Sequence, residues 1–78
     1  MLPIQCKMAR TALEMGVKQL ADAAAVSTNT IVRFERGEDL KPRTIAAIRT
    51  VLEKEGVIFL DGEYSGVGGP GIRLKAME

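Results

Sequence analysis

The chain has 78 residues with eleven Lys/Arg, ten Asp/Glu and no His, which gives a formal net charge of +1. A chain of this length has room for one small domain, and the lack of histidine excludes His-based acid–base catalysis and nearly all zinc sites. Cys6 is the single cysteine, so an internal disulfide is excluded and a reducing compartment is indicated.

No apolar run approaches the roughly 18 residues of a membrane span, and the N-terminus lacks the pattern of a secretory signal. We therefore expect a cytoplasmic protein without a membrane partner. The charge is unevenly distributed, because residues 1–50 hold eight Lys/Arg against five Asp/Glu and residues 51–78 hold three against five. The basic excess lies in the first two thirds of the chain, where a polyanion would bind.

Four helices are predicted in the first 55 residues, because apolar residues recur there at helical spacing between glycine and proline boundaries. A Pro at the start, an N-terminal Ser cap on the third helix and glycines after the third and fourth helices support these boundaries. The expected ranges are about 3–14, 17–24, 28–36 and 43–55.

The run from Val17 to Arg36 has the pattern of a helix-turn-helix. A short helix is followed by a turn at Ala25-Val26, after which Ser27 caps the next helix. In that second helix Ile31 and Phe34 fall on one face, and Thr28, Asn29, Val32 and Arg33 fall on the opposite one. This division predicts an apolar face toward the core and a polar face toward a ligand.

After Gly56 the apolar residues no longer recur at helical spacing, and the pattern predicts two short antiparallel strands. Residues 57–59 are β-branched or aromatic and are followed by Leu60, and residues 71–75 alternate apolar with basic side chains. Two pairings are possible: a tight turn at Asp61-Gly62, or a long glycine-rich loop that pairs the two segments. We favour the second, because only this pairing uses the alternation in the last segment. The glycine-rich loop lacks the Lys-Ser/Thr of a phosphate-binding loop.

Residues 3–55 resemble the Xre/Cro-type, phage-repressor-like helix-turn-helix regulators. The resemblance rests on apolar or small residues at the positions where that family has them, on a Val-Ser entry to the second helix of the motif, and on the ending Phe34-Glu35-Arg36-Gly37. The matching positions are Leu20, Ala21, Ala24, Val26, Ser27, Ile31 and Phe34. The fold class implied is a mostly α, compact four-helix DNA-binding domain over residues 1–56, with a C-terminal two-stranded β extension over residues 57–78.

The resemblance implies double-stranded DNA as the partner, with the third helix in the major groove. Side chains at the start of that helix would then contact base edges, and cations at helix starts and in the following loop would contact phosphates. The predicted base contacts are Thr28, Asn29, Thr30 and Arg33, and the predicted phosphate contacts are Lys18, Gln19, Arg36, Lys41 and Arg43.

The resemblance also implies that Glu35 turns inward to pair with Arg10 of the first helix. Two positions depart from the family pattern. Val17 replaces the usual Gln that contacts a phosphate, and Ala25 replaces the usual Gly of the turn, where a left-handed backbone costs Ala about 1 kcal/mol.

A domain of this size contacts few base pairs, so the expected form is a homodimer on an inverted repeat. The candidate dimerisation surfaces are the exposed face of the fourth helix and the β extension. We favour the β extension, with pairing of strand edges across a two-fold axis as one arrangement. The residues predicted to take part are Val57, Ile58, Phe59, Leu60, Ile72 and Leu74. The function expected is a transcriptional regulator, foremost an autoregulatory repressor of the kind found on phages and mobile elements, without enzyme activity, cofactor, metal or small-molecule ligand. The alternative is a protein-interaction module, such as an antitoxin or antiactivator, that keeps the helix-turn-helix scaffold.

Overall fold

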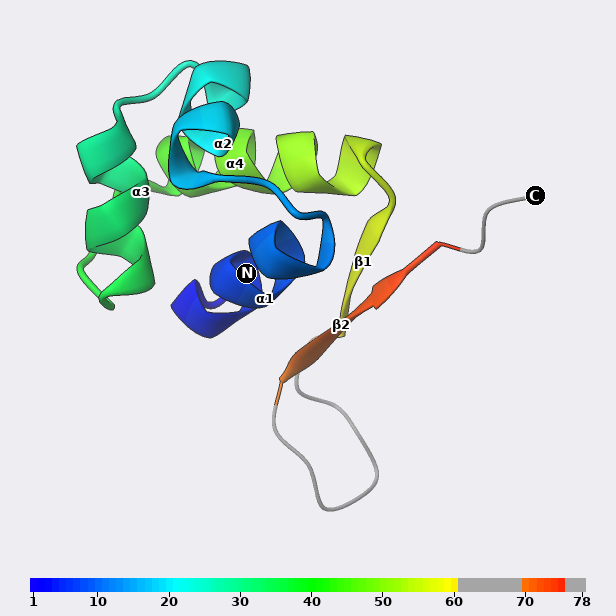
Figure 1. Ribbon diagram of the computed structural model, residues 1–78. Helices are drawn as coiled ribbons and strands as arrows, with labels where there is room; N and C mark the ends of the chain where they lie inside the picture. Colours follow the sequence, from blue (N-terminus) through cyan, green and yellow to red (C-terminus); the bar gives the residue numbers. More distant parts are fainter. Residues whose placement is uncertain (61–69, 76–78) are drawn as a thin grey trace.

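The computed structural model of the protein describes residues 1–60 and 70–75 (Figure 1). Four helices, α1 (Pro3–Ala12), α2 (Val17–Ala24), α3 (Thr28–Glu35) and α4 (Pro42–Lys54), precede two strands, β1 (Val57–Leu60) and β2 (Gly71–Leu74). The prediction of a mostly α chain with a C-terminal two-stranded extension is confirmed. Helix α1 ends two residues earlier than expected, because Glu14 already has a left-handed backbone with φ 55°.

The core lies where the four helices meet, because each contributes side chains from one face. Leu20, Ile31, Ile48 and Leu52 are the largest apolar side chains that are fully buried, and Cys6 is buried with them. Helix α4 passes behind α2 in Figure 1, and both its buried residues are part of this core. The cluster therefore fixes α3 against α2 and α1, and α4 against α2.

Strands β1 and β2 pair antiparallel, with Val57 opposite Leu74 and Phe59 opposite Ile72. This confirms the predicted pairing of the two segments across the long connection. The rejected turn at residues 61–62 and the glycine-rich run 66–69 lie outside the described residues. Burial alternates along β1: Val57 and Phe59 are buried, and Arg49 of α4 lies over the Phe59 ring, 4.9 Å from its centroid. The hairpin thus completes the core of its own chain.

Gln5 of α1 is a fully buried polar residue that joins the helix to both strands. Its side-chain amide donates to the carbonyls of Leu60, at 3.2 Å, and Gly71, at 3.0 Å, and its Oε1 accepts from the Leu2 N–H at 2.7 Å. Both amide hydrogens and the oxygen are thereby satisfied, which burial of such a group requires. Gln5 fixes the end of the hairpin against α1.

Candidate nucleic-acid interface

The connection between α2 and α3 is a tight turn with a left-handed residue at its centre. Ala25 has φ 57° and ψ 42°, and the Val26 N–H donates to the Ala21 carbonyl at 3.0 Å. Ser27 then caps α3, because its hydroxyl accepts from the Thr30 N–H at 3.1 Å. The turn is therefore defined on both sides by hydrogen bonds that satisfy helix-end groups.

Helix α3 has an apolar face in the core and a polar face outside. Ile31 and Phe34 are buried, whereas Thr28, Asn29 and Arg33 are exposed. This places three of the four residues predicted to contact bases on the open face. The fourth, Thr30, is half-buried and its hydroxyl lies 2.8 Å from that of Ser27, so it takes part in the cap.

Arg33 is already engaged by an acidic residue of the following loop. Its Nε donates to Glu38 Oε1 at 3.1 Å, and both side chains are 46% exposed. An ion pair this exposed contributes only about 0 to 1 kcal/mol, so the guanidinium can exchange Glu38 for another acceptor at little cost. This partner was not predicted from the sequence, although an acidic residue five positions after an arginine at a helix end indicates such a pair.

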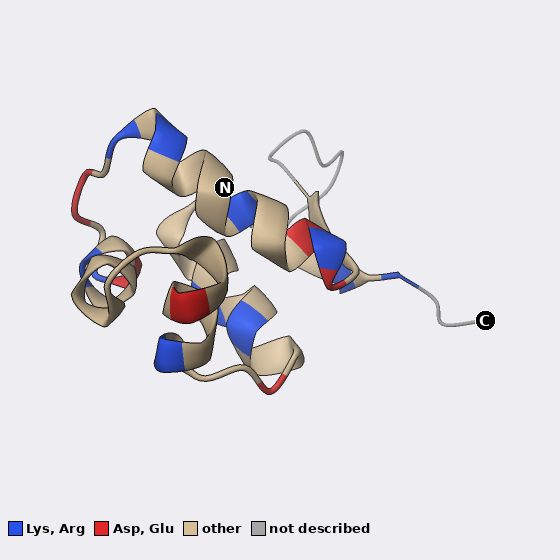
Figure 2. Ribbon diagram, turned by 90° about the horizontal axis from the view of Figure 1, so that it is seen from above, with Lys and Arg blue, Asp and Glu red and all other residues tan. Residues whose placement is uncertain are grey.

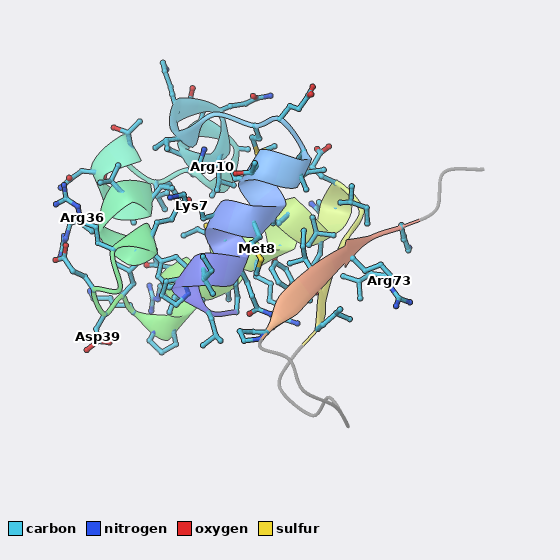
Figure 3. All side chains as sticks on the ribbon, turned by 60° about the horizontal axis from the view of Figure 1, so that its bottom comes forward. Lys7, Met8, Arg10, Arg36, Asp39 and Arg73 are labelled. Atoms are coloured by element: carbon cyan, nitrogen blue, oxygen red, sulfur yellow. The ribbon has the colours of Figure 1, made fainter. Side chains whose placement is uncertain are left out.

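Arg10 and Glu35 form a bidentate ion pair that ties α3 to α1. Arg10 Nε donates to Glu35 Oε2 and Nη2 donates to Oε1, both at 2.9 Å, and the side chains are only 17% and 11% exposed. Arg10 Nη1 also donates to the Met15 carbonyl at 3.3 Å, in the connection after α1. One guanidinium thus links α1 to the end of α3 and to the connection before α2. Arg10 is labelled among the helices in Figure 3.

The thiol of Cys6 lies against the same carboxylate, 3.5 Å from Glu35 Oε2. Burial, together with the negative charge of Glu35, raises the pKa of Cys6 to about 12. The hydrogen bond to Glu35 raises the pKa of Arg10 above its ordinary value. The cluster therefore contains a neutral thiol beside one carboxylate and one guanidinium, and Cys6 is without thiolate reactivity at neutral pH.

The residues predicted to contact phosphates are all exposed: Lys18, Gln19, Arg36, Lys41 and Arg43. Arg36 points outward from α3 in Figure 3. Lys18 pairs with Asp22 at 3.0 Å, and Figure 2 shows acidic segments interleaved with the basic ones around these helices. The surface around these helices thus carries both positive and negative charges. Val17 is half-buried against the core, so the start of α2 offers Lys18 and Gln19 as its polar side chains.

The residues predicted for dimerisation differ in exposure. Val57 and Phe59 are buried within the chain itself, so in this conformation they are not available to a second copy. Ile58, Leu60 and Leu74 are exposed, and Ile72 is half-buried. The available apolar surface of the hairpin is therefore the outer face of β1 and the side of β2 away from β1.

Within residues 1–60 and 70–75, no group of three or more His, Cys, Asp or Glu side chains could hold a metal ion. None of the four helices is long and apolar enough to cross a membrane. Gln5 is the main structural residue that was not predicted from the sequence.

No model of a known protein family matches the chain, and a search of curated proteins gave no match either.

Proposed function

We propose that the protein is a sequence-specific DNA-binding transcriptional regulator of the helix-turn-helix type. One observation supports this above the others: α3 is held by buried Ile31 and Phe34 while Thr28, Asn29 and Arg33 stand exposed on its other side. An exposed polar helix face on a fixed scaffold suits the major groove, whose width admits one α-helix.

Each exposed side chain has a partner of matching chemistry on a base or phosphate. The fork of Arg33 fits O6 and N7 of guanine, and the amide of Asn29 fits N6 and N7 of adenine. Lys18, Gln19, Arg36, Lys41 and Arg43 supply donors for phosphates, which fix the position of the helix without selecting a sequence. Thr30 serves the cap of α3 first, so we assign it the smallest part in base selection.

The regulator acts as a homodimer on an inverted repeat, because one α3 contacts too few base pairs for useful affinity. Repression of its own gene is the regulation we propose, through occupancy of a site that overlaps the promoter. The competing possibility, a module that binds another protein through the same scaffold, draws support from the mixed charge around α3 and from Val17 at the start of α2.

A random-site selection followed by mobility-shift titration tests the proposal. The expected result is an enriched inverted repeat bound with an affinity that falls steeply with salt, by about 0.9 log unit per log unit of salt for each phosphate contacted. Asn29→Ala should weaken binding to the enriched site, and Thr50→Ala, an exposed change on α4, is the matched control. Binding that is absent, or equal for all sequences, would reject the proposal in favour of a protein partner.

A further inference from the structure

Strand β2 has an edge whose main-chain groups have no partner among the described residues. The sheet places β1 on one side of β2, and no described strand lies on the other side. The Lys75 N–H donates to the Gly56 carbonyl at 2.7 Å, and hydrogen-bonded pairs alternate along an antiparallel ladder. The main-chain groups of Arg73 therefore point toward β1, and those of Ile72 and Leu74 point away from it.

An apolar groove of about 510 Å³ lies between α1 and this strand. It is lined by Ile4, Lys7, Met8, Thr11, Ala12 and Ile72. Ile4 is 51% exposed and Leu74 is 44% exposed, although both are large aliphatic side chains. Unpaired main-chain groups and apolar surface thus occur together, and this is the combination that an added strand covers.

Three exposed cations lie along this surface, and none has an ion-pair partner among the described residues. Lys7 lines the groove, Arg73 is on β2 and Lys75 follows that strand. The basic residues that do form ion pairs in the described part of the chain are Arg10, Lys18, Arg33 and Arg49. An apolar centre with unpaired positive charges around it is complementary to an acidic, partly apolar segment.

The order of side chains on β2 specifies the pattern of that segment. Ile72 lines the groove, whereas Arg73 is directed away from α1 in Figure 3, as expected for successive residues of a strand. A strand added at the open edge places every second side chain beside Ile72 and Leu74. The intervening side chains lie beside Arg73 and Lys75. The complementary segment therefore alternates apolar with acidic residues.

We propose that this edge and groove bind an extended segment of a partner protein in which apolar and acidic residues alternate. The segment pairs antiparallel with β2, the commoner arrangement, and forms a third strand. A second copy of this chain is less complementary, because its own β2 brings Arg73 and Lys75 to positively charged surface. A nucleic acid matches the cations but leaves the apolar groove uncovered. The homodimer of the proposed function then uses the other candidate surface, the exposed face of α4.

This site is separate from α3. Helix α1 contacts both α3 and β2, and it lies between them in Figure 1. A partner bound at β2 therefore leaves Asn29 and Arg33 of α3 exposed. The proposal goes beyond DNA binding and does not depend on it: a second protein is held next to the regulator while α3 stays free.

Selection from a random ten-residue peptide library against the full chain tests the proposal. At about 0.15 M salt, where exposed charges more than about 8 Å apart are largely screened, we expect enrichment of peptides that alternate apolar with acidic residues. The double variant Arg73→Glu/Lys75→Glu should select basic residues in place of the acidic ones. Arg36→Glu is the control, because Arg36 lies on the opposite side of the molecule from Arg73 in Figure 3, and it should select as the wild type does.

Circular dichroism verifies that each variant is folded. Enrichment without alternation, or an unchanged preference for acidic residues in the folded double variant, would overturn the proposal. Displacement of the enriched peptide by a single-stranded oligonucleotide would also overturn it, because the cations would then serve a nucleic acid.

Methylation of main-chain nitrogens in the enriched peptide tests the strand pairing. The apolar residues of the peptide lie opposite Ile72 and Leu74, so their N–H groups point toward β2, and those of the acidic residues point away. N-methylation at two apolar positions should lower the affinity by about ten-fold, because two hydrogen bonds are lost. N-methylation at two acidic positions should leave the affinity within about two-fold. Equal effects of the two changes, or a loss from the acidic positions alone, would overturn the pairing.

Ile4→Glu tests the groove. It places a carboxylate in apolar surroundings, so the affinity for the enriched peptide should fall by about ten-fold or more. Ala46→Glu introduces the same charge at an exposed position of α4 and should leave the affinity within about two-fold. Unchanged affinity in Ile4→Glu would overturn the proposal.

Sedimentation without peptide tests whether a second copy occupies the site. Ile4→Glu should self-associate as the wild type does, and loss of a wild-type dimer in this variant would overturn the proposal. The proposed function is tested separately. Selection of alternating peptides by a protein that binds no DNA keeps this site and removes the regulator, and selective DNA binding without such peptides does the reverse.

Discussion

The guanidinium of Arg33 is bonded to Glu38 at 3.1 Å, so the side chain to which we assign the strongest base contact has an acidic competitor within its own chain. Glu38→Gln weakens this competitor and removes a negative charge beside the proposed DNA-binding face of α3. We expect DNA affinity to rise by up to about five-fold, the equivalent of an exposed ion pair of about 1 kcal/mol. Mobility-shift titration at fixed salt measures the change. Glu55→Gln, the same substitution at the end of α4, should leave affinity within about two-fold of the wild type.

Substitutions of Arg33 and Lys41 are expected to change different properties of DNA binding: sequence selection for Arg33, and affinity for all sites alike for Lys41. Arg33→Ala should cost about 1 to 3 kcal/mol at the preferred site and relax selection at one base position, because a bidentate base contact is lost. Lys41→Ala should weaken all sites alike and reduce the salt slope by about one contact. Titrations on the preferred site and on a site with one base changed, at several salt concentrations, distinguish the two. Identical behaviour of the variants would show that the assignment of base and phosphate contacts is wrong.

Loss of Glu35 should destabilise the domain far more than loss of Glu38. Glu35→Ala leaves the Arg10 guanidinium mostly buried without its carboxylate, which costs about 3 kcal/mol. Glu38→Ala removes an exposed pair and should cost less than about 1 kcal/mol. Urea denaturation of the two variants gives both free energies. Equal stabilities would show that the Arg10–Glu35 pair does not hold α3 to α1.

The left-handed backbone of Ala25 predicts a stabilising substitution. Ala25→Gly removes a steric cost of about 1 kcal/mol at φ 57° and should raise the melting temperature by about 4 to 8 °C. Ala46→Gly, at an exposed position inside α4, should lower stability by about the same amount, because glycine is unfavourable within a helix. A melting temperature that falls in Ala25→Gly would contradict the strain assigned to this turn.

The raised pKa of the buried Cys6 thiol predicts a loss of stability at alkaline pH. Its pKa is raised from 9.0 to about 12 by folding, so between these values the unfolded chain loses the thiol proton and the folded chain keeps it. The buried protonated thiol therefore makes its full contribution to the free energy of unfolding below pH 9. This contribution falls as pH rises toward 12, by about 1 kcal/mol at pH 10. Urea denaturation at pH 7 and pH 10 should show this loss in the wild type and not in Cys6→Ala. An equal loss in both proteins would assign the alkaline sensitivity to other groups.

The helices were predictable because their boundaries are local. Ser27 caps α3 with its own hydroxyl, and Gly37 and Gly56 follow α3 and α4 with φ 95° and 99°, so the residue types at these positions specify the helix ends. The division of α3 into buried Ile31 and exposed Asn29 also follows from spacing alone. The pairing of β1 with β2 was predictable from alternation in the second strand.

Long-range polar contacts were not predictable in the same way. Nothing in the spacing of Gln5 distinguishes it from a solvated residue of an amphipathic helix, because its partners are main-chain carbonyls distant in the sequence. The bond from Arg10 to the Met15 carbonyl was likewise missed, since every residue presents the same main-chain acceptor. Such contacts require the three-dimensional arrangement of the chain.

The hydrogen bonds of Gln5 impose a time order on folding during synthesis. They join residues 55 and 66 positions apart, so the Gln5 amide cannot make both hydrogen bonds until Gly71 has been synthesised. At about 5 to 20 residues per second, Gly71 follows Lys54, the last residue of α4, by about 1 to 3 s. Helices assemble far faster than this. Each helix is therefore expected to form before the Gln5 amide completes its hydrogen bonds to the hairpin.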